Sequence, residues 1–354
     1  MAEQLDNYRL LGRSGLRVSP LSLGTMTFGV EQSWGSSDAE AEQIFNLYAE
    51  RGGNFLDTAN FYASGRSERV IAKLVKDRRH RFAIATKYTL TMQPGDPNAS
   101  GNHRKNMLRS VEDSLKRLET DYIDLLYLHM WDSRTPVEEI LRAFDDLVRA
   151  GKVLYVGLSD IPAWQASRMQ AIADLRGWSP LVALQIPYNL TERTVERDLI
   201  PMAREMGMGV LPWSPLAGGV LSGKYAQQDL AKAPSNMKVG IDSRKDINQA
   251  TGRLSEHNLA IAATVKTIAD EINCTSAQVA LAWTLLNPGV TSTILGVRTP
   301  AQLQDNLGAL DITFSAEQKT RLETVSKIDL GFPHNLLTSP AMGMMFGGVK
   351  VASR

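Results

Sequence analysis

The feature that most constrains this fold is a regular alternation of short apolar runs and helical patterns along the chain. Short apolar runs bounded by turn residues are typical of buried strands, whereas apolar residues three and four positions apart indicate helices. Strands that alternate with helices predict a parallel sheet, and eight such units favour closure into a barrel. The expected strands are residues 21–24, 55–57, 82–86, 125–129, 153–158, 182–186, 209–213 and 293–296.

Helical patterns separate these strands. The expected helices are residues 39–51, 68–76, 105–118, 137–149, 164–173, 198–205, 256–271, 277–286 and 301–307. Runs at 8–11 and 16–19 flank a glycine-containing loop and predict an N-terminal β-hairpin. Residues 216–251 are the longest irregular segment, and residues 330–354 read as a C-terminal extension outside the barrel. We expect one α/β domain over residues 1–354, a (β/α)8 TIM barrel with this hairpin and this extension.

Composition narrows the function classes. The 354 residues include 39 basic and 38 acidic side chains, so the net charge of +1 creates no global field for nucleic acid or anionic lipid. Cys274 is the only cysteine, which excludes an intrachain disulfide and favours a reducing compartment. The first residues lack a signal-peptide pattern, and no apolar run approaches the ~20 residues that span a bilayer. We expect a cytoplasmic protein that binds neither nucleic acid nor membrane.

Four polar residues stand at or just past the ends of expected strands: Asp57, Tyr62, Lys87 and His129. Parallel barrels carry their chemistry at this end of the strands, so these side chains are expected to meet there. A tyrosine has a pKa of about 10, and a nearby ammonium lowers that pKa by stabilising the phenolate. With Asp57 paired to Lys87 and His129 orienting the substrate, the group would protonate a carbonyl oxygen. No residue can supply hydride, so a nicotinamide cofactor is implied.

Each of these residues also has a purely structural interpretation. Asp57 would serve as a helix cap, Tyr62 as packing, Lys87 as a solvated charge and His129 as a satisfied core histidine. The joint pattern is more specific than any one residue, because all four positions converge on one end of the predicted barrel.

Several motifs resemble the aldo-keto reductase superfamily in order and spacing. They are residues 24–29 (GTMTFG), 55–62 (FLDTANFY), 65–68 (GRSE), 86–87 (TK), 124–129 (DLLYLH), 157–160 (GLSD), 213–219 (WSPLAGG) and 294–298 (ILGVR). The resemblance covers about residues 8–325, and it is strongest to the branch with aryl-alcohol dehydrogenases and potassium-channel β-subunits. It implies a (β/α)8 barrel with Tyr62 as proton donor, Lys87 and Asp57 as its tuning pair, and His129 orienting the substrate.

The resemblance also implies NADP(H), bound across the carboxyl end of the barrel. No G-x-G-x-x-G sequence is present, so a Rossmann fingerprint is absent. In this resemblance Ser159 and Gln185 would bond the carboxamide, Trp213 would stack on the nicotinamide, and Arg298, with Arg244 as second candidate, would bind the 2′-phosphate. The full implied set is Gly24, Thr25, Met26, Asp57, Ser159, Asp160, Gln185, Trp213, Ser214, Pro215, Leu216, Gly218, Lys224, Arg244, Gly296, Arg298, Gln302, Asp305 and Asn306.

Some of these positions have open alternatives. Trp213 would equally suit packing at the barrel end, and Arg298 a solvated surface charge. Asp160 stands where many family members have asparagine, and an ionised carboxylate cannot donate a hydrogen bond. Asp160 would therefore accept from the carboxamide nitrogen, or cap the helix that begins near Pro162.

Apolar residues in loops after the first, third and fourth barrel strands favour an apolar, aromatic aldehyde or ketone as substrate. The candidates are Phe28, Trp34, Tyr88, Met130 and Trp131, and the alternative is that some of them pack under loops. A metal site is not expected, since the five histidines show no paired spacing.

Three functions remain open at this stage. The first is an NADPH-dependent carbonyl reductase acting on a small-molecule carbonyl or alcohol. The second is a nucleotide-sensing regulatory subunit, as the resemblance to channel β-subunits allows. The third is an aldolase with Lys87 as a Schiff base, against which Asp57 argues because an ion pair keeps the amine protonated. A homo-oligomer is also left open.

Overall fold

The computed structural model describes residues 4–29, 35–230, 244–345 and 347–349. Its centre is an eight-stranded parallel sheet in the order β10-β3-β4-β5-β6-β7-β8-β9. The strands are β3 (Leu21–Gly24), β4 (Phe55–Asp57), β5 (Ala83–Tyr88), β6 (Ile123–Leu128), β7 (Val153–Ser159), β8 (Leu181–Pro187), β9 (Gly209–Trp213) and β10 (Thr293–Gly296). A bridge between Val210 and Val290 brings the last two strands together and nearly closes the barrel. The predicted (β/α)8 barrel is confirmed.

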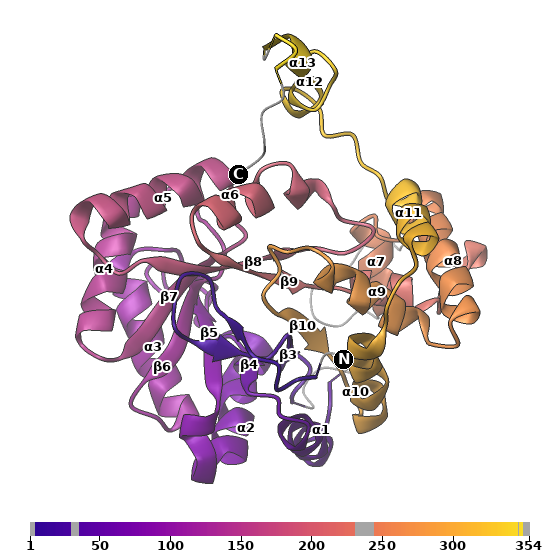
Figure 1. The fold of residues 1–354 in the computed structure, drawn as a ribbon. Coiled ribbons are helices and arrows are strands. Elements are labelled where there is room, and N and C mark those ends of the chain that lie inside the picture. The colour runs from indigo at the N-terminus through magenta and orange to yellow at the C-terminus, as the bar shows by residue number, and fades with distance from the viewer. Residues whose placement is uncertain (1–3, 30–34, 231–243, 346, 350–354) are drawn as a thin grey trace.

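Helices surround this sheet (Figure 1). They are α1 (Asp38–Glu50), α2 (Arg66–Val75), α3 (Arg104–Leu118), α4 (Val137–Arg149), α5 (Ala163–Arg176), α6 (Leu199–Glu205), α7 (Arg244–Ala250), α8 (Glu256–Glu271), α9 (Ser276–Leu285), α10 (Pro300–Leu307) and α11 (Ala316–Val325). Local sequence explains several of their starts. Ser37 and Thr275 each form a capping box with the residue three positions on, which satisfies backbone donors at the first turn.

The N-terminal hairpin closes the amino end of the barrel. Its strands are β1 (Arg9–Leu10) and β2 (Arg17–Val18), as the sequence predicts. Val18 in β2 and Leu11, just after β1, are fully buried in the inner core of the barrel. Gly12 has a φ of +53°, and an added Cβ would lie 2.3 Å from the Val182 carbonyl oxygen, so only glycine fits this approach. Because the hairpin covers the amino end of the barrel, we expect the active site at the carboxyl end.

The structure adds elements that the sequence analysis does not predict. The irregular segment 216–251 contains two 3-10 turns, η4 (Ala217–Ser222) and η5 (Gln227–Leu230), and ends in α7. Helix α11 follows the barrel. In the extension, the short helices α12 (His334–Leu337) and α13 (Met342–Met345) stand apart from the barrel (Figure 1). No helix in the described part of the chain is long and apolar enough to cross a bilayer.

Candidate active site

Two of the four predicted catalytic side chains lie in neighbouring strands, and the other two lie in the segments that follow β4 and β6. Asp57 ends β4, and Tyr62 opens the 3-10 turn η1 (Tyr62–Gly65) that follows. His129 comes directly after β6. Lys87 lies within β5 rather than just past it, because this strand continues to Tyr88. All four therefore lie at the carboxyl end of the barrel.

The amine of Lys87 is the centre of this group. Its Nζ donates to Asp57 Oδ1 at 2.6 Å, to the Thr58 carbonyl oxygen at 2.7 Å and to the Tyr62 hydroxyl at 3.3 Å. Lys87 and Asp57 are 1% and 2% exposed, so water screens this ion pair little. The second carboxylate oxygen of Asp57 accepts from Gln185 Nε2 at 2.7 Å. The geometry joins a buried ion pair directly to a phenol.

Burial and charge act in opposite directions on this phenol. Burial raises the pKa of Tyr62 above its usual value, and the Lys87 ammonium opposes this rise only in part. The expected net lowering of this pKa is therefore not found in the structure. For Lys87, burial favours the neutral amine, but the charge of Asp57 and the contact with Tyr62 outweigh it and raise the pKa. Lys87 stays an ammonium beside a protonated phenol.

His129 faces the same phenol. Its ring lies edge-on to Tyr62, with centroids 5.9 Å apart at 79°. Burial, with a smaller contribution from Lys87, lowers the pKa of His129 to about 3, so the imidazole is neutral at physiological pH. Its Nδ1 is buried without a hydrogen-bond partner among the described residues. A neutral imidazole here keeps one N–H to donate.

The residues predicted to face a nicotinamide lie at the ends of the next strands. Ser159 and Gln185 are buried and adjacent in the β7–β8 register. Trp213 ends β9, and its Nε1 donates to Asp160 Oδ1 at 3.1 Å. Burial raises the pKa of Asp160, although Trp213 and Lys87 oppose this rise.

The structure decides against the helix cap suggested for Asp160. The residue at the start of α5 is Pro162, and no side chain caps that helix. The carboxylate accepts from the Trp213 indole instead.

Two predicted contacts near β3 differ in their surroundings. Met26 is 37% exposed, whereas Thr25 is fully buried and its hydroxyl is bonded inside the protein. The Thr25 side chain therefore forms hydrogen bonds within the protein, to the Asp57 carbonyl and to Ser67. Gly24, at the end of β3, is buried, and an added Cβ would lie 2.7 Å from the Ile294 side chain.

The loop after β9 turns sharply. Ser214 has a φ of +53°, and its carbonyl oxygen accepts from Asn189 Nδ2 at 3.0 Å. Gly218 has a φ of +66°, and an added Cβ would lie 2.3 Å from Asn248 Oδ1, so the loop needs glycine here. Pro215 is buried and Leu216 is half-buried between them.

Four cations gather near the ends of β9 and β10, and we call Lys224, Arg244, Arg253 and Arg298 the basic cluster. Burial, then the charges of Arg298 and Arg244, lower the pKa of Lys224. Burial, then Arg253 and Arg298, lower the pKa of Arg244. Arg253, which the sequence analysis missed, also lies 5.9 Å from the centre of the Trp213 ring. Because neighbouring cations lower the pKa of both Lys224 and Arg244, these positions favour an incoming anion.

The remaining predicted contacts lie in the segment before α10 and along that helix. Arg298 and Gly296 are exposed, and the Arg298 backbone N–H donates to Gln302 Oε1 at 2.9 Å. Asp305 accepts from Thr275 Oγ1 at 3.0 Å and so ties α10 to the start of α9, while Asn306 is 5% exposed.

The predicted substrate contacts separate into two groups. Met130 is 47% exposed, and Trp131 is half-buried with its ring edge-on to Trp164 at 5.6 Å. Phe28 and Tyr88 are 1% and 0% exposed and belong to the core between sheet and helices, so neither presents a surface to a substrate. Trp34 lies outside the described residues.

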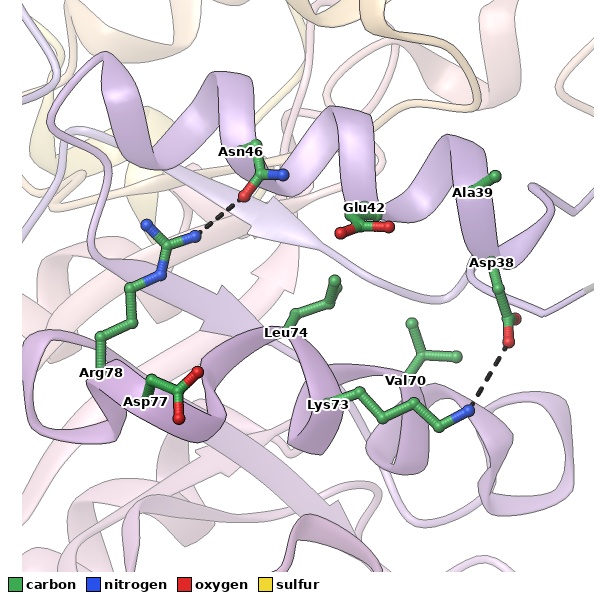
Figure 2. A pocket seen from close by; sticks show the side chains of 9 residues that line it. All are labelled: Asp38, Ala39, Glu42, Asn46, Val70, Lys73, Leu74, Asp77 and Arg78. Carbon is green, nitrogen blue, oxygen red and sulfur yellow. Dashed lines mark hydrogen bonds and ion pairs between the residues drawn. The ribbon is translucent and has the colours of Figure 1, made fainter.

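A separate pocket of about 560 Å³ lies between α1 and α2 on the outer side of the barrel (Figure 2). Lys73 faces Asp38 across it, and Arg78 donates to Asn46 at 2.8 Å. None of the predicted site residues lines this pocket. Among the described residues we find no group of histidine, cysteine and carboxylate side chains that would hold a metal ion.

Comparison with known proteins places this barrel in a family. A model of the aldo/keto reductase family matches residues 20–327. The norsolorinic acid reductase of Aspergillus flavus is 36% identical over 346 residues, which cover 94% of this chain and 84% of that protein. The uncharacterized oxidoreductase YrpG of Bacillus subtilis is 39% identical over 323 residues, covering 88% and 93%. An aryl-alcohol dehydrogenase of Pestalotiopsis microspora is 35% identical over 343 residues, covering 94% and 85%.

The fold and these matches define a barrel oxidoreductase class whose members generally use NAD(P)H. The chain belongs to the aldo/keto reductase family.

Proposed function

We propose that this protein reduces aldehydes or ketones to alcohols with NADPH, and that Tyr62 donates the proton. The observation that carries the proposal is the set of contacts at Lys87, which join Asp57 to the Tyr62 hydroxyl. These contacts supply a positioned acid, a permanent positive charge beside it and a counter-charge that keeps the amine protonated.

Each residue has one step in the proposed reaction. Tyr62 gives its hydroxyl proton to the carbonyl oxygen of the substrate and becomes a phenolate. Lys87 stabilises that phenolate, and Asp57 holds the ammonium in place. His129, neutral at working pH, donates a hydrogen bond to the same oxygen and fixes the carbonyl beside the phenol. NADPH, when bound, supplies hydride to the carbonyl carbon.

The residues present suit a phosphate-bearing dinucleotide. Trp213 and Gln185 lie at the strand ends where a nicotinamide is expected, and the basic cluster lies near the ends of β9 and β10. Because neighbouring cations of the cluster lower the pKa of Lys224 and of Arg244, a bound anion would relieve this repulsion. This charge supports NADPH over NADH, with Arg298 as the candidate for the 2′-phosphate.

An apolar substrate is supported by side chains at the same end of the barrel. Phe61, Met130 and Trp164 are 46%, 47% and 61% exposed, and Phe61 directly precedes the proposed proton donor. The sequence analysis did not select Phe61 or Trp164. Relatives named as norsolorinic acid reductase and aryl-alcohol dehydrogenase also support an aromatic carbonyl or alcohol.

The test is NADPH consumption over a panel of aromatic and aliphatic aldehydes and ketones, repeated with NADH. We expect turnover with NADPH, faster for aromatic than for short aliphatic carbonyls, and weaker turnover with NADH. A protein that binds NADPH but reduces nothing on the panel would contradict the proposal and favour a nucleotide-sensing subunit.

A further inference from the structure

Besides its two side-chain partners, the Lys87 ammonium has a backbone acceptor, the Thr58 carbonyl oxygen. An ammonium has three N–H donors, and here they go to the Asp57 carboxylate, the Thr58 carbonyl and the Tyr62 hydroxyl. The first two distances are 2.6 and 2.7 Å, and the third is 3.3 Å. The two short bonds therefore set the direction in which the remaining N–H points.

Both short acceptors belong to one dipeptide, Asp57–Thr58, which three buried hydroxyl groups hold. Ser67 Oγ lies 2.9 Å from Thr58 Oγ1 and 2.7 Å from Thr25 Oγ1. Thr25 Oγ1 in turn donates to the Asp57 carbonyl oxygen at 3.0 Å. Thr25, Thr58 and Ser67 are each 0% exposed, so water does not compete for these bonds.

The three hydroxyl protons are enough for one continuous chain. One assignment has Thr58 donate to Ser67, Ser67 to Thr25, and Thr25 to the Asp57 carbonyl. Each hydroxyl group then donates its one proton, and those of Ser67 and Thr25 also accept a hydrogen bond. Ser67 Oγ also lies 2.9 Å from the Thr25 carbonyl oxygen, a second acceptor that holds the serine beside the end of β3. The chain starts at the Thr58 hydroxyl and ends at the Asp57 carbonyl, so it restrains the backbone of this dipeptide.

The middle of this chain sits on a rigid support. Ser67 is in the first turn of α2, beside the fully buried carboxylate of Glu68. Glu68 accepts from Thr86 Oγ1 in β5 and from Arg117 Nε in α3, each at 2.6 Å. These bonds anchor the start of α2 to the strand that carries the lysine.

From this geometry we infer that Ser67 is a positioning residue for the proton-transfer site. Acting through Thr25 and Thr58, it fixes the carboxylate and the carbonyl that orient the Lys87 ammonium toward Tyr62. Ser67 itself does not touch the reacting atoms. The catalytic meaning of this role rests on the proposed function, whereas the orientation of the ammonium is testable without turnover.

The test compares variants that break the chain with variants that keep it. Ser67→Ala and Thr58→Val remove one hydroxyl each, and Thr58→Ser keeps the hydroxyl while it removes a methyl. Thr284→Val is the matched control, because its fully buried hydroxyl bonds the Leu281 carbonyl and Thr293 Oγ1 away from this site.

The first readout is hydrogen exchange of the Lys87 ammonium, followed by NMR in cofactor-free protein labelled with ¹⁵N-lysine. We expect exchange to be about tenfold faster in Ser67→Ala and Thr58→Val, since one hydrogen bond to the charged amine is weakened. Thr58→Ser and Thr284→Val should exchange as the wild type does. Wild-type exchange in both chain-breaking variants would overturn the inference.

The second readout is the separation of kcat from KM in carbonyl reduction. A less well oriented ammonium supports the phenolate less, so kcat of the chain-breaking variants should fall about tenfold while KM for the substrate changes little. A merely structural role would lower thermal stability without this split. If the wild type proves inactive, the proposed function fails alone, because the exchange measurement still decides the role of Ser67.

Discussion

Two groups of charged side chains lie toward the carboxyl end of the barrel, and they balance their charges in different ways. Around Lys87 the cation is paired with Asp57, both are almost fully buried, and strands β4 and β5 carry them. In the basic cluster, Lys224 and Arg298 are exposed, belong to loops and lie among like charges.

The difference separates a site for proton transfer from a site for binding. A buried and internally neutralised cluster has fixed geometry, which a catalytic acid requires. A group of mutually repelling cations gains most from an anion that arrives from outside. Substitutions in the first group should therefore affect kcat and stability, and substitutions in the second should affect cofactor affinity.

The largest effect is expected for Lys87→Met. Removing the amine leaves Asp57 charged and buried without its cation, which costs roughly 3–5 kcal/mol of unfolding free energy. The kcat for carbonyl reduction should fall by about 10² to 10⁴ because the phenolate loses its stabilising charge. Urea unfolding and steady-state kinetics measure the two effects.

The double variant Asp57→Asn with Lys87→Met is its control. Without the unpaired carboxylate, stability should recover in part while activity stays low. If Lys87→Met were as stable and as active as the wild type, the group around Lys87 would not be a site for proton transfer.

An intermediate effect is expected for Arg298→Ala in the basic cluster. Loss of a charged hydrogen bond to the 2′-phosphate should weaken NADPH binding by roughly 10- to 100-fold and leave NADH binding unchanged. The kcat at saturating NADPH should stay within about twofold. Fluorescence titration with both cofactors measures this, and Lys116→Ala, at an exposed position on α3, controls for net charge. Equal losses for NADPH and NADH would argue against Arg298 as the 2′-phosphate ligand.

An effect spread over several pH units is expected on acid stability through His129. Its pKa is about 3 in the folded protein against 6.5 for the free side chain, so only the unfolded chain binds this proton between these values. Stability should fall as the pH drops through this window, by at most about 1.4 kcal/mol per pH unit for one proton. Unfolding followed from pH 7 to pH 4 should show a shallower decline for His129→Gln. An unchanged pH dependence would mean that the imidazole is not held neutral.

The smallest effect is expected in the pocket between α1 and α2. Asp77→Asn changes an exposed carboxylate that lines it (Figure 2), so stability should change by no more than about 0.5 kcal/mol. NADPH affinity and kcat should match the wild type. A clear loss of NADPH affinity would move the binding site away from the basic cluster.

The barrel itself could be predicted from sequence because buried parallel strands read as continuous apolar runs. The same pattern does not show which way each side chain points. Lys87 and Tyr88 are neighbours in β5, and successive side chains of a strand face opposite sides. Lys87 points into the barrel, whereas Tyr88 packs edge-on to Phe144 and donates to the Asn102 carbonyl. Tyr88 is predicted to contact the substrate because of its position in the chain, and that prediction does not take this alternation into account.

Other features depend on contacts that no sequence pattern displays. The Thr58 carbonyl is a backbone group, so its bond to Lys87 is invisible in residue types. Arg253 reaches Trp213 only because the chain returns to the barrel end between α7 and α8. Burial and the Lys87 charge shift the pKa of Tyr62 in opposite directions. Which of them is larger depends on how deeply the phenol is buried, and the sequence does not show this.

The most direct test of the central proposal is Tyr62→Phe, measured for NADPH affinity and for carbonyl reduction in the same preparation. The substitution removes only the hydroxyl that contacts Lys87. We predict NADPH binding within about twofold of the wild type and a kcat lower by about a thousandfold or more. A variant that kept near-normal turnover would contradict the assignment of Tyr62 as the proton donor.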